Sequence, residues 1–353
     1  MAKKTVLFAS IFIVIAVLFL ISTLNPRNHS GKEESKISPA DSPVAPRRGF
    51  FMWVLPTPGA GQSFEEAYTQ ASGCFEFSPV WGRPTPFYEL AGDLSGWWGQ
   101  TFLAKNIRGK GMFPLIHVSF MREGVKLATP PGMENATLLD RSWRSAYKTA
   151  VIEVVKASKP LYLSLGNEVN RWFEKYGVKE GDPNGFQHYV SLYEEVYDAV
   201  KALSPETKVF CVFAREMVSE NREADLSVLS MFKADKIDLL VFTSYPYAVQ
   251  GVNRPSDIPD DYYSKALGYL PVKLFGFSEL GWSSLEAFGG EEAQAEFVTQ
   301  ASGRLTRDRG VNLHLFGWAW LHDLDESDSI GLIKSNRIEK LAYAEWKNLS
   351  ESG

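Results

Sequence analysis

From residue 49 onward, short apolar runs alternate with segments whose apolar residues recur at helical spacing. A short apolar run is typical of a buried strand, and a period of three to four residues is typical of a helix packed along one face. Such alternation predicts a parallel sheet with helices outside it. The runs of strand length are Gly49–Leu55, Cys74–Ser78, Met112–Ser119, Leu161–Gly166, Lys208–Ala214, Leu239–Ser244, Val272–Ser278 and Leu313–Trp318.

The helical segments between these runs carry recognisable signals. Ser63 followed by Glu66 forms a capping box, which marks the start of the first helix. The clearest apolar stripe predicts the fourth helix, which we expect to end before Ser204-Pro205. Eight strands alternating with helices are what a closed (β/α)8 TIM barrel requires. We therefore predict one α/β barrel domain over residues 49–353. The stripe residues are Phe186, Tyr189, Val190, Tyr193, Val196, Tyr197 and Val200.

The amino-terminal residues do not follow the barrel pattern. Lys3 and Lys4 precede an apolar run from Thr5 to Leu24, and twenty residues in a helix span roughly 30 Å, the hydrocarbon core of a bilayer. We expect residues 1–24 to be a single-pass membrane anchor with the following domain outside the cell membrane. The alternative is a cleaved signal segment and a secreted protein.

Residues 25–48 predict a flexible linker, because they are rich in Ser, Pro, Lys and Glu and contain no aromatic residue. Asn28, Asn135 and Asn348 each open an Asn-x-Ser/Thr sequence, which agrees with an extracellular location.

Composition narrows the range of partners. The chain has 353 residues, of which 45% are hydrophobic and 13% aromatic, enough for one large core. A net charge of -5 without a long basic block argues against nucleic acid as a partner. We expect Cys74 and Cys211 to be buried thiols, with a disulfide as the alternative. The five histidines show no metal-ligand spacing, so we expect no metal site.

Two glutamates stand at the ends of predicted strands. Glu168 follows the fourth apolar run and Glu279 follows the seventh. In a parallel barrel the carboxyl ends of the strands share one mouth, where the reactive groups gather. Two carboxylates about 5–5.5 Å apart can cleave a glycosidic bond with retention of configuration. The pattern therefore indicates a pair of catalytic carboxylates that acts on a carbohydrate.

The motifs around both glutamates resemble those of clan A glycoside hydrolases. Leu165-Gly-Asn-Glu-Val169 is similar to the fourth-strand motif of that clan, and Ser278-Glu-Leu-Gly-Trp282 to its seventh-strand motif. Within the clan, these segments and Tyr245-Pro-Tyr247 resemble family 17, the β-1,3-glucanases, and family 53, the endo-β-1,4-galactanases. Leu280 and Ser283 depart from the family 17 motif, which has Ser and Pro there. The resemblance covers about 25 residues and implies a (β/α)8 barrel, retention and no cofactor.

The resemblance implies a role for each motif residue. Glu168 is the expected acid/base and Glu279 the expected nucleophile, while Asn167 orients the sugar 2-hydroxyl. Tyr245 is placed to donate to Glu279 and keep it ionised.

Further candidates follow the predicted strands. Aromatic rings stack on the apolar faces of sugars, so tryptophans near the mouth are candidate binding residues. Core packing is the alternative for each of them, and a buried interior histidine is the alternative for His117. The remaining candidate substrate-binding residues are Trp53, Trp81, His117, Trp282, Trp318 and Trp320.

Three functions remain open from the sequence. The first is an extracellular retaining hydrolase of a β-linked poly- or oligosaccharide. The second is a non-catalytic carbohydrate-binding barrel at a surface, which would not require both carboxylates. The third is a transglycosylase that remodels surface glycans through the same covalent intermediate. The sugar, its linkage, endo or exo action and the oligomeric state stay open.

Overall fold

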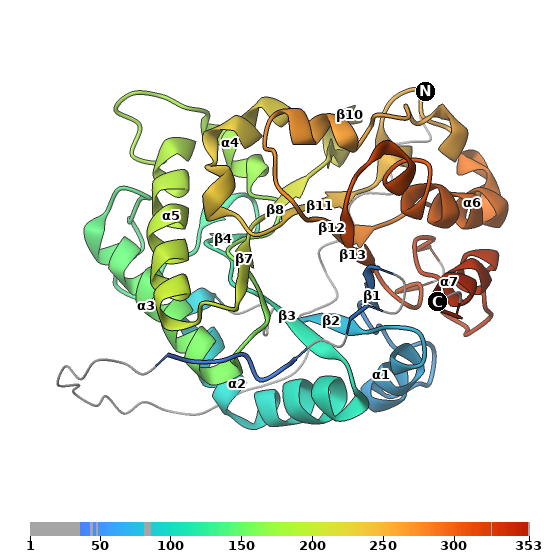
Figure 1. Cartoon of the computed structure of the whole chain (residues 1–353), viewed down its shortest axis with the longest axis horizontal. Helices are drawn as coiled ribbons and strands as arrows, with labels where there is room; N and C mark the ends of the chain where they lie inside the picture. Colours follow the sequence, from blue (N-terminus) through green and yellow to red (C-terminus); the bar gives the residue numbers. More distant parts are fainter. Residues whose placement is uncertain (1–35, 43–44, 47–48, 81–85, 326, 352–353) are drawn as a thin grey trace.

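A parallel β-barrel forms the centre of the molecule, with helices around it (Figure 1). The computed structural model describes residues 36–42, 45–46, 49–80, 86–325 and 327–351. Neighbouring strands follow the order β7-β6-β3-β2-β1-β13-β12-β11-β8. The strands are β1 (Phe51–Val54), β2 (Phe77–Val80), β3 (Phe113–His117), β6 (Tyr162–Ser164), β7 (Lys208–Phe210), β8 (Val212–Ala214), β11 (Leu240–Ser244), β12 (Phe275–Leu280) and β13 (Leu313–Trp318).

The predicted run Lys208–Ala214 forms one barrel strand in two segments. The segments β7 and β8 are separated by the buried Cys211; β7 pairs in parallel with β6, and β8 with β11. Nine segments thus occupy the eight predicted barrel positions, and this interrupted strand links the two ends of the sheet order. The strand pattern of a TIM barrel is confirmed.

A helix follows six of the eight barrel strands, as predicted. The two exceptions are the connections from β8 to β11 and from β11 to β12, where the described residues form 3₁₀ turns and, in the first, a short antiparallel hairpin, but no α-helix. Pro246, Pro255, Pro259 and Pro271 explain the second exception, because proline lacks an N–H and disrupts a helix interior. The helices are α1 (Phe64–Ser72), α2 (Phe87–Ser95), the π-helix Gly99–Ile107, α3 (Arg141–Ser158), α4 (Asn170–Tyr176), α5 (Phe186–Leu203), α6 (Gly290–Ser302) and α7 (Leu341–Glu351).

The predicted helix signals have the expected contacts. Ser63 caps α1, accepting from the Glu66 N–H, while the Glu66 carboxylate accepts from the Ser63 N–H. The whole predicted stripe of α5 is buried, and the helix ends at Leu203. Two antiparallel hairpins lie outside the barrel sheet: β4 (Met121–Arg122) with β5 (Lys126–Leu127), and β9 (Glu216–Met217) with β10 (Arg222–Glu223).

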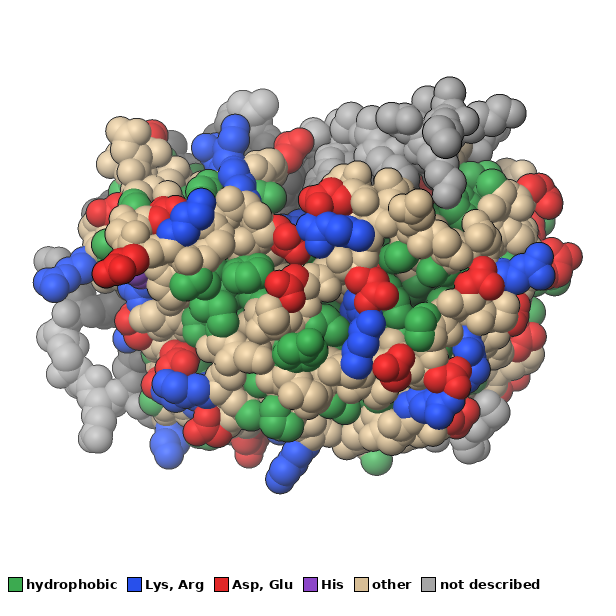
Figure 2. All heavy atoms as spheres, turned by 90° about the horizontal axis from the view of Figure 1, so that it is seen from above, with side chains coloured by type: hydrophobic (Ala, Val, Ile, Leu, Met, Phe, Trp, Pro, Cys, Tyr) green, Lys and Arg blue, Asp and Glu red, His purple; other side chains and the backbone are tan. Residues whose placement is uncertain are grey.

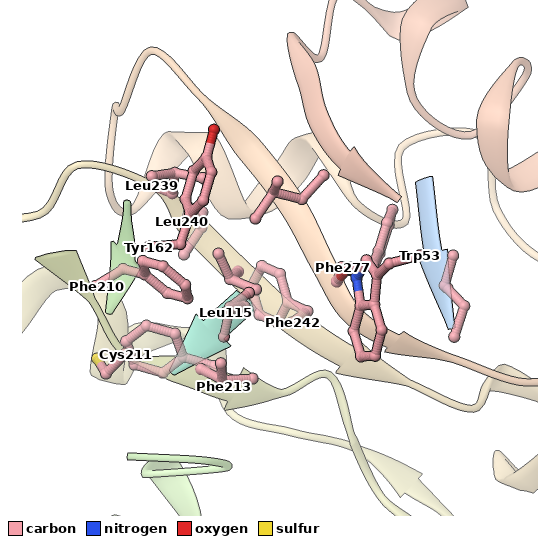
Figure 3. Packing of buried hydrophobic residues seen from close by; sticks show 14 of the residues in the cluster. Trp53, Leu115, Tyr162, Phe210, Cys211, Phe213, Leu239, Leu240, Phe242 and Phe277 are labelled. Atoms are coloured by element: carbon pink, nitrogen blue, oxygen red, sulfur yellow. Dashed lines mark hydrogen bonds between the residues drawn. The ribbon is translucent and has the colours of Figure 1, made fainter. Parts of the chain in front are cut away.

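Large apolar side chains from opposite strands fill the barrel (Figure 3). Trp53, Leu115 and Phe277 are all fully buried there. Gly317 makes room for the Trp53 indole, since a Cβ at that position would stand 1.9 Å from Trp53 Nε1. The barrel interior is therefore a packed core, and ligands must bind at one of its ends.

Part of the expected linker is held against the domain. Ile37 N–H donates to the Leu203 carbonyl at 2.8 Å, and Ala40 N–H donates to the Lys159 carbonyl at 2.9 Å. Arg108 forms a two-pronged ion pair with Asp41 at 2.7 Å and also donates to the Ser158 carbonyl. The prediction of a flexible linker over residues 25–48 is therefore corrected for residues 36–42.

The predicted anchor at residues 1–24 lies outside the described residues. Within the described ranges, no helix combines the length and the apolar character needed to cross a membrane. Both cysteines are free thiols, Cys211 buried and Cys74 half-buried. On the face shown in Figure 2, acidic and basic side chains are interspersed with apolar ones.

Candidate active site

Glu168 stands where the fourth barrel strand leaves the sheet. The chain beyond β6 stays attached to the fifth strand, because Val212 N–H donates to the Gly166 carbonyl and Val169 N–H to the Val212 carbonyl. Glu168 itself adopts a left-handed conformation with φ of 51°. Such a conformation costs a non-glycine residue on the order of 1–3 kcal/mol, and residues strained in this way cluster at functional sites.

The Glu168 carboxylate has two partners. Thr243, the buried penultimate residue of β11, donates its hydroxyl to Glu168 Oε1 at 2.8 Å. Arg171, in the first turn of α4, forms an ion pair through Nε with Glu168 Oε2. Neither Thr243 nor Arg171 was among the predicted site residues.

Glu279 lies within β12 rather than after it, because the strand ends at Leu280, two residues later than predicted. Its Cα pairs in register with that of Thr243, the residue that contacts Glu168. Tyr245 donates its hydroxyl to Glu279 Oε2 at 2.8 Å, as expected. Asn167 Nδ2 donates to Glu279 Oε1 at 3.5 Å. The two glutamates therefore have separate hydrogen-bond partners, but they are close enough for the negative charge of Glu168 to act on Glu279.

The two glutamates and their neighbours Asn167 and Tyr245 can be reached from solvent. Asn167, Glu168, Tyr245 and Glu279 are each partly exposed, whereas the strands that carry them are otherwise buried. Four residues predicted from the sequence therefore lie together in the structure, at a solvent-accessible place at the carboxyl ends of the strands.

The electrostatics differ from the expectation for Glu279. Burial, followed by the negative charge of Glu168, raises the pKa of Glu279 to about 7, although the hydrogen bond from Tyr245 lowers it. The hydrogen bond from Tyr245 therefore offsets only part of the rise in the pKa of Glu279. Burial and the charge of Glu279 hold the pKa of Tyr245 well above its usual value, so its hydroxyl remains a donor.

Glu216 fixes the backbone of Tyr245. It is buried and accepts the Tyr245 N–H at 2.7 Å through Oε2, while Ser244 and Tyr262 donate to Oε1, each at 2.8 Å. Arg215, fully buried beside it, stacks on the Tyr262 ring. The sequence placed Arg215 and Glu216 at a strand end but gave no sign that they support Tyr245.

Three predicted binding tryptophans lie in the core instead of lining an open surface. Trp53, Trp282 and Trp318 have no exposed surface. Each donates its indole N–H to a backbone carbonyl, that of Phe277, Phe288 and Ile330 respectively. All three tryptophans are therefore core residues, which was the alternative to sugar binding. A tryptophan near a strand end satisfies the sequence pattern whether its ring points into the core or into the mouth.

Trp320 and His117 remain near the mouth. Trp320 retains 8% exposure, and its indole N–H donates to Asp328 Oδ2 at 2.6 Å. His117 is the last residue of β3, and burial lowers its pKa to about 3, so the imidazole is neutral. Trp81 lies outside the described residues. Among the described residues, no cluster of His, Cys, Asp and Glu could hold a metal ion.

Several solved structures with the same fold are described as glycoside hydrolases. One is a psychrophilic glycoside hydrolase family 10 endo-β-1,4-xylanase, with 14% identity, a TM-score of 0.60, and coverage of 85% of this chain and 96% of that chain. Another is a family 39 glycoside hydrolase from the gut symbiont Bacteroides cellulosilyticus WH2, with 14% identity and a TM-score of 0.58. The match covers 87% of this chain but only 64% of that chain.

A third is the GH5_18 protein from Streptomyces cattleya in complex with GlcNAc, with 14% identity and a TM-score of 0.57. This match covers 90% of this chain and 80% of that chain. At these identities the likeness establishes the barrel fold. It does not confirm the narrower resemblance to families 17 and 53. No family model and no curated protein matches the sequence.

Proposed function

We propose that this chain is a retaining glycoside hydrolase that cleaves a β-linked poly- or oligosaccharide by double displacement. The observation that carries the proposal is that two carboxylates lie at one barrel mouth, Glu168 bound by Thr243 and Glu279 bound by Tyr245 and Asn167. The glycoside hydrolases that share the fold support the same reading.

The two glutamates take different roles in this mechanism. Glu279 attacks the anomeric carbon as the glycosidic C–O bond breaks, and Glu168 gives its proton to the departing oxygen. The product of this step is a glycosyl ester on Glu279 and a free alcohol. In the second step Glu168 removes a proton from water, whose oxygen displaces Glu279 from the anomeric carbon. The ester bond breaks and both carboxyl groups return to their starting states.

The resting protonation requires a change before catalysis. The raised pKa of Glu279 favours a proton there, while Glu168 forms an ion pair with Arg171. Attack requires an ionised Glu279, so this residue must lose its proton before it acts as the nucleophile. Retaining glycosidases need such a pair of carboxyls in unequal states.

Substitution of each glutamate tests the proposal. Glu279→Gln should lower activity by several orders of magnitude with folding retained, because the covalent route is lost. Glu168→Ala should affect poor leaving groups far more than activated aryl β-glycosides, and azide should restore turnover and give a β-glycosyl azide. Glu180→Gln, an exposed loop residue, is the matched control.

The substrate panel should contain β-linked glucans, xylans, mannans and galactans, with and without acceptor sugars. Transfer to the acceptor in preference to water would identify a transglycosylase. Azide rescue of the Glu279 variant alone, giving an α-glycosyl azide, would reverse the two roles. Normal activity in both variants would end the glycosidase proposal, and binding without any cleavage would favour a carbohydrate-binding protein.

We further propose that the domain acts outside the cytoplasm, attached through residues 5–24 or released by cleavage. The lysines before that apolar run and the exposed sequon at Asn135 support this location. Fractionation of cells with amino-terminal sequencing separates attachment from secretion.

A further inference from the structure

A second group of charged residues lies beside Glu168. The helix α4 begins two residues after Glu168 and carries Arg171 and Lys175, which share one face because they are four residues apart. Lys175 Nζ donates to the carbonyls of Val125 at 2.8 Å and Gly124 at 3.3 Å. This face of α4 is therefore attached to the turn of the β4–β5 hairpin, which follows the end of β3.

The hairpin carries two further cations in an unfavourable position. Arg122 and Lys126 are direct cross-strand partners, and both are exposed. Like charges opposite each other destabilise a strand pair. Within the described ranges neither residue has a carboxylate partner. Glu123 in the turn is also exposed and makes no ion pair there, and Glu174 of α4 binds Arg222 instead.

Arg171 has unused hydrogen-bonding groups. Its Nε is buried against Glu168, but the side chain as a whole is 26% exposed. Its two terminal nitrogens have no hydrogen-bond partner among the described residues. A guanidinium in that state can bind a carboxylate or sulfate in a forked geometry.

Arg171 connects this surface to the proposed acid/base. Its Nε contacts Glu168, while its terminal nitrogens are available to a ligand. A negatively charged group of the substrate bound there would lie beside Glu168.

We propose that the substrate is an anionic β-glycan, whose carboxylate or sulfate groups bind a cationic edge formed by Arg122, Lys126, Arg171 and Lys175. The inference rests on the proposed hydrolase function and names its substrate class. Arg171 in this edge contacts Glu168, so an anionic group bound there would lie beside the proposed acid/base. Charge also guides the ligand, because opposite charge raises the rate of encounter.

Binding to matched glycans tests the proposal without catalysis. Full-length protein with Glu279→Gln is titrated with a β-glucan and with its carboxymethylated and sulfated derivatives, which share one backbone. We expect the anionic derivatives to bind roughly tenfold more tightly at low salt, with the difference largely lost at high salt. Comparison of the two derivatives separates carboxylate from sulfate recognition.

Two double variants with the same charge change locate the effect. Arg122→Gln with Lys126→Gln should remove most of the preference for the anionic derivatives. Arg141→Gln with Lys148→Gln, on the outer face of α3, should leave it intact. Arg171 is not varied because it touches Glu168. An equal loss in both double variants, or equal binding of neutral and anionic glycans, overturns the proposal.

Different results would refute the hydrolase function and the anionic substrate. Wild-type protein that hydrolyses neutral β-glycans faster than acidic ones would refute the anionic substrate and keep the hydrolase. Anionic glycans that bind through the hairpin but are never cleaved would refute the hydrolase and keep the cationic edge.

Discussion

Two side chains near the end of one strand hold both carboxylates. Thr243 donates to Glu168 and Tyr245 donates to Glu279, and residues two apart on an extended chain point to the same side. The carboxyl end of β11 is therefore the part that sets the relation between the two glutamates. Glu216 adds to this control by binding the Tyr245 N–H.

Replacement of Tyr245 by Phe should change the pH dependence of activity. The hydroxyl stabilises the charged form of Glu279, so its loss raises the pKa of Glu279 further above the usual range. Because the nucleophile must be ionised, the acidic limb of kcat/KM should move to higher pH by about one pH unit. Activity at pH 6 then falls more than activity at pH 8. An unchanged acidic limb with a uniformly lower rate would show that Tyr245 acts in another way.

At the scale of elements, the apolar pattern predicted every barrel strand, and strand ends identified Asn167, Glu168, Tyr245 and Glu279. The pattern could not identify Thr243, because a threonine inside an apolar strand has no polar signal of its own. It also missed Arg171, since an arginine in the first turn of a short helix resembles a solvated charge. The (β/α)8 pattern implied a helix after every strand, but the described residues after β8 form a hairpin and 3₁₀ turns, and those after β11 form 3₁₀ turns in a segment that contains four prolines.

The turn after β12 offers a test of how closely the strands support the site. A Cβ on Gly281 would stand 2.6 Å from Tyr245 Cε1 and 2.7 Å from Ile330 Cγ2, so Gly281→Ala must displace the tyrosine ring. A misplaced Tyr245 hydroxyl should lower kcat/KM on the order of tenfold to a hundredfold, with the fold retained by circular dichroism. Gly268→Ala, whose Cβ meets no atom within 4 Å, is the control. Equal activity in the two variants would contradict this account of Tyr245.

At the scale of the whole molecule, residues from before the barrel are attached at the end remote from the carboxylates. Ile37 and Ala40 bind the last residue of α5 and the residue after α3, which lie a few residues before the strands β7 and β6. Composition predicted a linker here because the segment is polar. Composition does not reveal that backbone hydrogen bonds of Ile37 and Ala40, and one ion pair between Asp41 and Arg108, fix this segment.

A pair of truncated chains measures this attachment. A chain that begins at Lys36 keeps the contacts of Ile37, Ala40 and Asp41, whereas one that begins at Gly49 loses them. We expect the shorter chain to be less stable by about 2 kcal/mol in urea unfolding, since several hydrogen bonds of about 1 kcal/mol each are lost. Asp41→Asn in the longer chain should reproduce part of the loss. Identical midpoints for all three would mean that the segment adds nothing in solution.

The attached segment at residues 36–42 also determines where a tag or solid support lies relative to the carboxylates. The chain enters at the starts of the strands, while the carboxylates lie beyond the strand ends. A fusion partner, affinity tag or solid support joined ahead of Lys36 therefore sits behind the catalytic opening. Immobilisation through the amino terminus should leave a long polymer free to approach from the front.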